Sequence, residues 1–407
     1  MSTIIVSNIN KTEPEFEFVE RKGIGHPDTL SDSLAEKLSR EYSEYTLNKY
    51  GAVLHHNFDK VGLLGGSSYV SFGKGHLVRP IRVLINGRVS ISFAGERIPV
   101  RKMLVNWTKE FFKVAMPMID VDEDLEFHMN LSNQSSPGKT YEEESKKGAR
   151  RRWFEPESLD DIPELKKLVS NDTSLGVGYA PFSKLEKLVI ELEKKLTGEF
   201  KSQNNWMGTD VKIMGVRIGE KFHITMCIPQ ISSHVASLEE YIANLDKARS
   251  YVKKAIASHE ISDFELDINT RDNTELRELY LTATGSSLES GDEGLVGRGN
   301  RVNGVISPMR PMSMEGASGK NPIYHIGKIY YVAAFEFANS IYEKYGIYNE
   351  VYLVSQSGRD LQDPWVTVVA VPNDFERQEE LKKFIAEQLP DIPNLSTKIL
   401  SGSLSLS

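Results

Sequence analysis

A glycine-containing turn brings an imidazole and a carboxylate to the expected start of a helix. Gly23 and Gly25 precede the tripeptide His26, Pro27 and Asp28. The free N–H groups and the positive dipole end of a helix N-terminus attract anions. His26 is therefore a candidate hydrogen-bond donor to phosphate, and Asp28 a candidate ligand for Mg²⁺. The alternative is a plain helix cap, in which Asp28 satisfies the first-turn N–H groups and His26 only packs.

A second tract, residues 291–301, is acidic at one end and basic at the other. Its charged side chains include Asp292, Arg298 and Arg301, with glycines between them. Glycines let the backbone approach a ligand, a carboxylate binds a metal or an amine, and arginine donates a forked pair of hydrogen bonds to phosphate. These groups suit a metal–nucleotide complex. The alternative is a surface loop whose charges pair with one another.

A third tract resembles part of a phosphate-binding loop. Gly319 and Lys320 follow small residues, with His325 and Lys328 close behind. The full spacing of the Walker motif is absent, so this is not a Walker loop. Lys320 is either a point charge for phosphate or an exposed lysine in a turn.

Two shorter tracts are weak on their own. Asp172 stands in a polar run that leads into Gly178 and Tyr179, and Asp210 and Lys212 precede an apolar alternation. Each tract could simply be a turn followed by a strand.

No side chain is a convincing nucleophile. The Gly-x-Ser-x-Gly pattern is absent, the single cysteine, Cys227, sits in an alternating strand, and no histidines have metal-ligand spacing. The adjacent His55 and His56 would point to opposite faces of a strand, which indicates a structural role for at least one. Glycines, cations and carboxylates remain. They can stabilise a polyphosphate leaving group while a substrate supplies its own nucleophile.

Composition restricts where this chemistry takes place. The chain has 407 residues, enough for about two or three domains, and a net charge of −8. Because there is no global positive field, neither nucleic acid nor a membrane surface is an expected partner. One cysteine cannot form an intramolecular disulfide, and no apolar run is long enough to cross a membrane. We therefore expect a cytoplasmic protein.

Periodicity and capping signals predict the elements that position these residues. The helix at 28–49 should start at the Pro-Asp pair and end before Gly51. Ser183 and Glu186 form a capping box for a helix closed by Gly198. Further helices are expected at 107–114, 237–258, 328–345 and 374–388, and strands at 54–64, 77–86, 211–216, 222–228, 265–269, 279–284, 350–356 and 365–371.

Two long segments lack periodicity. Residues 132–161 are predicted to form a long loop, whose run of three arginines at 150–152 is interpreted as a solvated charge run. The segment 292–319 is rich in glycine, and a loop of that length in a compact domain usually serves function.

The grouping of strands and helices predicts an α+β fold. We expect three lobes, each a mixed or antiparallel sheet backed by helices. Their approximate bounds are 1–130, 131–270 and 271–407, and the lobes can interleave.

The tracts, taken in order, resemble one family. They run from Glu20 to Asp28, from Leu54 to Asn57, from Asn171 to Pro181, from Gly297 to Arg301 and from Arg310 to Pro322. Together they are similar to the archaeal-type S-adenosylmethionine synthetases, also called methionine adenosyltransferases, over roughly residues 20–400. Five ordered tracts are far more specific than any one alone.

The resemblance implies three similar lobes in a pseudo-threefold arrangement and a homodimer with active sites between subunits. It also implies the reaction. The sulfur of methionine attacks C5′ of ATP, intact triphosphate leaves, and the enzyme hydrolyses it to phosphate and pyrophosphate, with Mg²⁺ and K⁺ as cofactors. A thioether needs no deprotonation, whereas a departing triphosphate needs cations, which agrees with the residues found.

Residue roles follow from the resemblance by position. His26 would contact the leaving oxygen, with Lys320 and Arg298 neutralising the triphosphate. Asp28 would bind Mg²⁺, and Asp59 is a candidate for the monovalent cation. The remaining positions are Asp172 and Asp292 for methionine, and Asp210, Lys212, Arg301 and Lys328 for ATP and its triphosphate.

Parts of the family pattern have no clear counterpart here. The glycine-rich tract before the central loop is replaced by residues 132–138, and a second set of Mg²⁺ ligands is not evident. Two rival functions stay open. One is a Mg²⁺-dependent phosphotransferase or polyphosphatase, and the other is a catalytically silent nucleotide-binding protein of the same fold.

Overall fold

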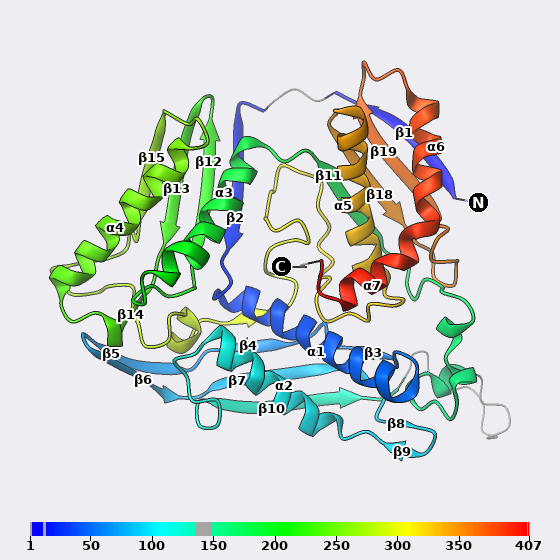
Figure 1. Ribbon diagram of the computed structural model, residues 1–407, viewed down its shortest axis with the longest axis horizontal. Coiled ribbons are helices and arrows are strands. Elements are labelled where there is room, and N and C mark those ends of the chain that lie inside the picture. The colour runs from blue at the N-terminus through cyan, green and yellow to red at the C-terminus, as the bar shows by residue number, and fades with distance from the viewer. Residues whose placement is uncertain (1, 11–13, 135–148, 405, 407) are drawn as a thin grey trace.

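The computed structural model describes residues 2–10, 14–134, 149–404 and 406. Three sheets of four or five strands, each backed by helices and each with its own hydrophobic cluster, make up most of this part of the chain (Figure 1). The expected combination of several sheets with helices behind them is confirmed. None of the described helices is both long and apolar enough to cross a membrane.

One sheet has the strand order β15-β13-β12-β2. Its strands are β2 (Phe16–Lys22), β12 (Lys212–Ile218), β13 (Lys221–Cys227) and β15 (Phe264–Ile268). Helices α3 (Lys184–Lys195) and α4 (Leu238–Ala257) back it. The capping box that opens α3 is present, with Ser183 Oγ accepting from Glu186 N and Glu186 Oε2 accepting from Ser183 N. The predicted stop at Gly198 is wrong, because a π-helical turn at Leu196–Phe200 continues through it.

A second sheet has the order β10-β7-β4-β17, with β3 also pairing with β7. Its strands are β3 (His56–Asn57), β4 (Gly62–Leu64), β7 (Ile81–Val89), β10 (Leu125–Ser132) and β17 (Gly294–Leu295). Helices α1 (Pro27–Tyr50) and α2 (Val100–Ala115) cover it. The central row Leu30, Leu34 and Leu38 of α1 is fully buried in its core.

The third sheet has the order β1-β19-β18-β11. Its strands are β1 (Thr3–Ile9), β11 (Leu175–Ala180), β18 (Asn349–Val354) and β19 (Val366–Pro372). Helices α5 (Ile326–Tyr345), α6 (Gln378–Gln388) and α7 (Leu395–Leu400) complete it. Three two-stranded ribbons pair β5 (Ser67–Ser71) with β6 (Lys74–Arg79), β8 (Ser92–Phe93) with β9 (Glu96–Arg97), and β14 (Gln230–Ile231) with β16 (Leu281–Thr282).

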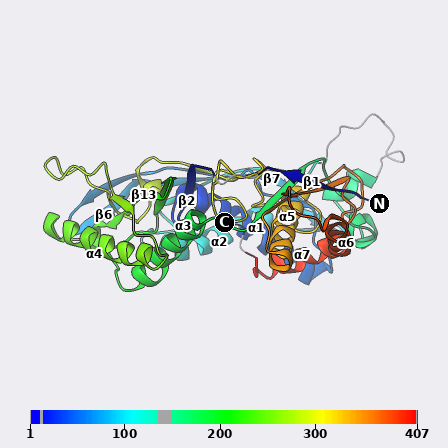
Figure 2. The same cartoon turned by 90° about the horizontal axis from the view of Figure 1, so that it is seen from above.

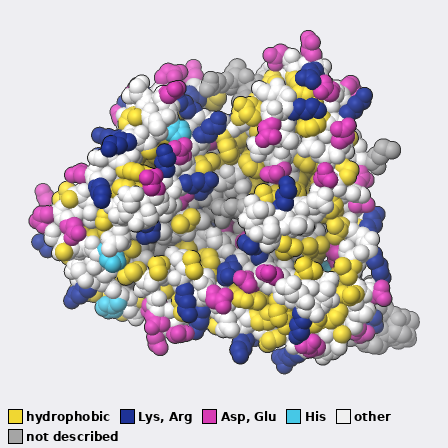
Figure 3. Space-filling model, viewed as in Figure 1, with side chains coloured by type: hydrophobic (Ala, Val, Ile, Leu, Met, Phe, Trp, Pro, Cys, Tyr) yellow, Lys and Arg dark blue, Asp and Glu magenta, His cyan; other side chains and the backbone are white. Residues whose placement is uncertain are grey.

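The sheets take strands from distant parts of the chain. β1 pairs in parallel with β19 near the other end of the sequence, β2 pairs with β12, and β17 pairs with β4. The edge-on view shows a flat molecule, with α4, α5 and α6 along one side and β1 and β7 toward the other (Figure 2). Side chains of both charges are interspersed over the helix-bearing face (Figure 3).

The long segment between β17 and α5 is almost free of helix and strand, as its sequence predicted. Most of the other predicted long loop, residues 135–148, lies outside the described residues. Beyond it, Arg152 pairs with Asp161 and Glu157 at 3.4 and 3.3 Å, which is typical of a solvated charge run.

Candidate active site

The turn before α1 is packed against the strand that follows Thr209. Gly23 N donates to Val211 O and Gly25 N donates to Thr209 O, at 2.6 and 3.0 Å. A Cβ on Gly25 would lie 2.6 Å from the carbonyl carbon of Thr209, closer than real contacts allow. The glycine therefore serves close backbone packing, which brings residues 25–28 beside Asp210.

His26 is the N-cap of α1. Its Nδ1 accepts from Asp28 N at 3.2 Å, so the ring proton of the neutral imidazole must be on Nε2. Burial, the largest cause, lowers the pKa of His26, while the nearby carboxylate of Asp210 opposes the shift. A lowered pKa favours the neutral imidazole, whose Nε2 proton can be donated to a ligand.

The carboxylate of Asp28 lies between a cation and a backbone N–H. Lys22 Nζ is 2.8 Å from Asp28 Oδ2 and also donates to Arg298 O. Leu295 N donates to Asp28 Oδ1 at 3.0 Å, and Arg298 Nε is 3.9 Å from the same oxygen. Asp28 therefore joins the start of α1 to the glycine-rich tract.

Asp28 fits a magnesium site in which the protein supplies one carboxylate and the substrate supplies phosphate oxygens. Among the described residues, no group of three or more His, Cys, Asp or Glu side chains is placed to hold a metal. Mg²⁺ often takes only one or two carboxylates, with phosphate and water completing its shell. Asp28 can supply one oxygen of that kind once Lys22 is displaced from it.

Asp210 and Asp292 meet at Ser287. Ser287 N donates to Asp210 Oδ2 at 2.8 Å, and Ser287 Oγ lies 2.6 Å from Asp210 Oδ2 and 3.1 Å from Asp292 Oδ2. Asp210 is buried, and burial is the largest cause that raises its pKa, whereas Asp292 is exposed. The amino-terminal cluster, as we name it, contains Lys22, His26, Asp28, Asp210, Lys212, Asp292 and Arg298.

The two outer cations of this cluster are accessible. The Arg298 side chain is 69% exposed, and Lys212, 44% exposed, is 3.4 Å from Glu20. Long exposed side chains can reorient toward a bound anion at little cost, whereas Lys22 is held in place.

A second group of predicted residues lines a cavity of about 290 Å³. Asp59, Asp172 and Lys320 all face it. Lys320 is buried, with its Nζ bonded to Glu315 and to Gly316 O and 3.9 Å from Asp59 Oδ2. The cavity cluster, as we name it, contains Asn57, Asp59, Lys60, Gly87, Arg88, Asp172, Glu315, Lys320 and His325.

Two ammonium groups lie close to the Asp59 carboxylate. Lys60 Nζ is 2.5 Å from its Oδ2, and Lys320 is the second cation nearby. A monovalent cation at Asp59 would have to displace both, so this assignment stays a prediction.

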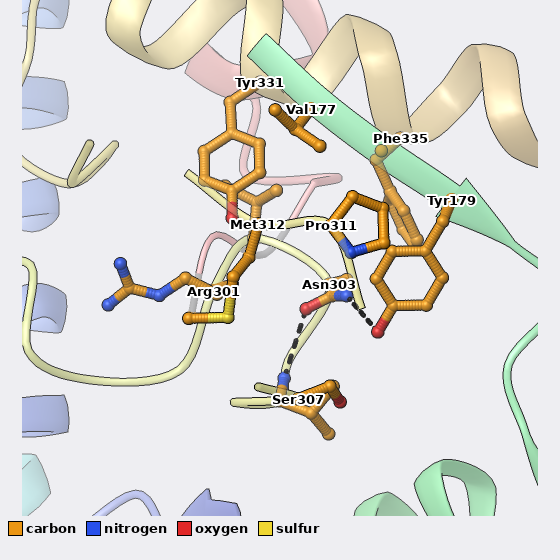
Figure 4. Close-up of a pocket in the computed structure, with 12 residues that line it drawn as sticks. Val177, Tyr179, Arg301, Asn303, Ser307, Pro311, Met312, Tyr331 and Phe335 are labelled. Carbon is orange, nitrogen blue, oxygen red and sulfur yellow. Dashed lines mark hydrogen bonds between the residues drawn. The ribbon is translucent and has the colours of Figure 1, made fainter. Parts of the chain in front are cut away.

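Two cationic side chains that were predicted to bind phosphate are bonded to other groups of the protein. Lys328 is fully buried and donates to both oxygens of Glu36 at 2.8 and 2.6 Å. Arg301 donates to the carbonyl oxygens of Gly297 and Gly299. In Figure 4 the Arg301 side chain extends away from Tyr179, and the void there is about 10 Å³, the size of a single water. As folded here, Arg301 holds the backbone of the glycine-rich tract, and Lys328 joins α5 to α1.

The two clusters lie against different turns of α1. The amino-terminal cluster includes Asp28 in its first turn, whereas Ser39 Oγ donates to Lys320 O further along. Eleven residues of helix correspond to about 16 Å. One chain therefore brings the predicted residues together in two groups rather than one.

Sequence reasoning missed several members of these clusters. Lys22, Lys60, Arg88 and Glu315 were not singled out, and His325 was noted without a role. Lys22 directly precedes Gly23, so its place beside the glycine turn could have marked it as a site residue. The others are brought to the cavity only by the tertiary fold. A larger groove of about 810 Å³, beside Phe182, contains none of the predicted site residues.

Known proteins resemble this chain over nearly its whole length. The sequence model of the family described as S-adenosylmethionine synthetase (AdoMet synthetase) matches residues 2–150 and 155–403. The S-adenosylmethionine synthase of Aeropyrum pernix is 40% identical over 399 residues, covering 95% of this chain and 92% of that protein. That of Haloarcula marismortui is 34% identical over 406 residues, covering 98% and 97%.

A solved structure shares the fold. It is described as an unusual S-adenosylmethionine synthetase from Campylobacter jejuni, with a TM-score of 0.60 at 14% identity, covering 94% of this chain and 88% of that one. The full-length match to the family model and the relatives above 30% identity confirm the resemblance and the enzyme class that the sequence predicted: the chain belongs to the S-adenosylmethionine synthetase family.

Proposed function

We propose that this protein forms S-adenosylmethionine from ATP and methionine. The observation that carries the proposal is the pair of clusters, which hold cations and carboxylates on a chain that matches the family over nearly its whole length. Neither cluster contains an activated serine or cysteine. In this proposal the nucleophile is the methionine sulfur, whose lone pair needs no base.

In the proposed transfer, a sulfur lone pair forms the bond to C5′ and the C5′–O bond breaks. Its electron pair leaves on the triphosphate, and the sulfur becomes a sulfonium with no proton transferred. His26 would donate from Nε2 to the leaving oxygen, where negative charge develops. Arg298 and Lys320 would neutralise the chain of phosphates, and Asp172 and Asp292 would hold methionine. We assign Asp210 and Lys212 to the nucleotide.

In the proposed second step, water attacks a terminal phosphorus of the triphosphate. The new P–O bond replaces the bridging P–O bond, whose electron pair leaves with pyrophosphate, and one proton is released. Mg²⁺ at Asp28 would supply charge neutralisation for the phosphates, and K⁺ is expected to support activity. Lys328 and Arg301 stabilise the surrounding loop in this scheme.

We further propose a homodimer, with three similar lobes in each subunit and active sites built between subunits. The separation of the clusters along α1 supports this, because the amino-terminal cluster of one copy would face the cavity cluster of the other. We expect the enzyme to work in the cytoplasm without a nucleic-acid or membrane partner.

The test is incubation of the purified protein with ATP, methionine, Mg²⁺ and K⁺, followed by chromatography. S-adenosylmethionine, phosphate and pyrophosphate should appear in equal amounts. Release of ADP without methionine would instead identify a phosphotransferase, and ATP binding without turnover a silent homologue.

Two substitutions test the roles. Lys320→Ala should lower turnover by about a hundredfold or more without unfolding the protein, because the triphosphate loses a buried cation. His26→Asn keeps a capping oxygen and should slow single-turnover adenosyl transfer more than hydrolysis of triphosphate. Equal losses in the two steps would contradict the role of His26.

A further inference from the structure

We propose that His325 is a second catalytic imidazole, which donates a hydrogen bond from Nε2 to the triphosphate during its hydrolysis. The inference rests on the proposed function and adds a residue to it. His325 lines the 290 Å³ cavity together with Lys320, Lys60 and Arg88. The sequence tract around Lys320 predicted phosphate binding without assigning this side chain.

The backbone fixes the tautomer of His325. It is the N-cap of α5, and its Nδ1 accepts from Gly327 N at 3.3 Å. A nitrogen that accepts carries no proton, so in the neutral ring the proton is on Nε2. Within the part of the chain that the structure describes, no hydrogen bond is made by Nε2. This N–H is thus available to a ligand in the cavity.

The surroundings keep the ring neutral. Burial, the largest cause, and the positive charges of Lys320, Lys328, Lys60 and Arg88 hold the pKa of His325 well below its ordinary value. The cations around the cavity attract an anionic ligand, and the neutral imidazole can donate a directed hydrogen bond to that ligand.

Among the described residues, His325 and the neighbouring Arg88 have no carboxylate partner, unlike the two lysines of the cavity. Lys320 is bonded to Glu315 and Lys60 to Asp59, so both ammonium groups must leave a carboxylate before they serve a phosphate. The imidazole N–H needs no such exchange, and its position is already set by the cap. It is therefore a preorganised donor in the cavity, held in place by the helix cap.

The two histidine caps belong to different clusters, and we assign them to different chemical steps. His26 and His325 cap α1 and α5 with the same Nδ1 geometry, and each leaves an Nε2 donor. His26 belongs to the amino-terminal cluster, which is assigned to the triphosphate oxygen that leaves C5′. His325 belongs to the cavity cluster, together with Lys320. We therefore expect His325 to act on phosphate oxygens remote from C5′.

The test compares His325→Asn with wild type in both chemical steps. Asparagine keeps an oxygen that can accept from Gly327 N, but its amide N–H lies closer to the backbone than imidazole Nε2 and does not reach as far into the cavity. With added inorganic tripolyphosphate and Mg²⁺, hydrolysis should fall about tenfold to a hundredfold. Single-turnover formation of S-adenosylmethionine should change less than about threefold, so intact triphosphate should accumulate. His128→Asn, at an exposed histidine of β10, is the matched control.

His325→Gln is the rescue variant, because its longer amide can offer an N–H toward the cavity. Partial recovery of tripolyphosphate hydrolysis in this variant would support the donor role. Unchanged hydrolysis in His325→Asn would overturn it, as would equal loss of both steps in both variants, since a cap role alone predicts that. A wild-type protein that forms no S-adenosylmethionine would instead refute the proposed function.

Discussion

Lys22 and Asp28 form a nearly buried ion pair, with Lys22 Nζ 2.8 Å from Asp28 Oδ2, at the position where a metal-bound phosphate is proposed to sit. The two side chains are 10% and 7% exposed. Asp28 thus has a structural partner in the free protein and, in the proposed complex, would have a metal-bound phosphate as a second partner, and these two roles can be separated by mutation.

Asp28→Asn should destabilise the protein by about 3 kcal/mol, because it leaves the ammonium of Lys22 buried without its partner. The double variant Lys22→Met with Asp28→Asn removes both charges and should recover most of that loss. Formation of S-adenosylmethionine should stay low in both variants, since each lacks the proposed metal ligand. Urea unfolding and the product assay measure the two effects. Full activity in the double variant would remove Asp28 from the metal site.

Gly25→Ala tests the close packing behind His26. The new methyl group would overlap the Thr209 backbone, which cannot move without displacing Asp210. We expect a loss of about 3 kcal/mol in the free energy of unfolding. Gly198→Ala is the control, because a Cβ there meets nothing within 4 Å. Similar unfolding midpoints for the two variants would contradict the packing argument.

Asp32 should make stability depend on pH. Burial, the largest cause, raises its pKa to about 6, while Gly297 N donates to its Oδ1 at 2.8 Å. The unfolded value is about 3.9. Because the folded chain binds this proton more tightly, the stabilisation from protonation is full below about pH 4 and is lost as the pH rises through 6.

The shift corresponds to about 3 kcal/mol between the two ends of that range. Asp32→Asn cannot titrate, so the wild type should gain stability relative to this variant between pH 7 and pH 4. Urea midpoints measured for both proteins across this range give the difference directly. Parallel curves would show that Asp32 keeps an ordinary pKa.

Local signals in the sequence predicted α1 to within one residue at each end. Pro27 begins the helix, and Gly51 ends it with φ at +81°, a backbone conformation that favours glycine. The capping box predicted the start of α3 equally well. The end of α3 could not be predicted, because a π-helical turn depends on how Leu196 and Phe200 pack in the core.

Contacts between distant segments could not be predicted from the sequence. β1 was missed because β19, the strand with which it pairs, lies near the other end of the chain. The glycines of the 291–301 tract suggested close approach to a ligand, yet a Cβ at Gly294 would lie 1.9 Å from Pro27 O. Its position is set by packing against α1. The role proposed for His325 likewise rests on the cavity around it.

A mixing experiment tests whether the two clusters of one site belong to different subunits. His26→Asn disables the amino-terminal cluster, and Lys320→Ala disables the cavity cluster. Each pure variant should be nearly inactive in adenosyl transfer. If a site is built between subunits, a mixed dimer contains one site in which both clusters are intact.

Random exchange of subunits makes half of the dimers mixed, so about a quarter of all sites should be active. The two variants are mixed, exchanged under mild denaturant and assayed for S-adenosylmethionine, with each variant treated alone as the control. If each site were made by one chain, every site would carry one disabled cluster and mixing would restore nothing. Recovery of activity would therefore place Lys320 opposite His26 of the other subunit, even though one α1 helix carries contacts to both clusters.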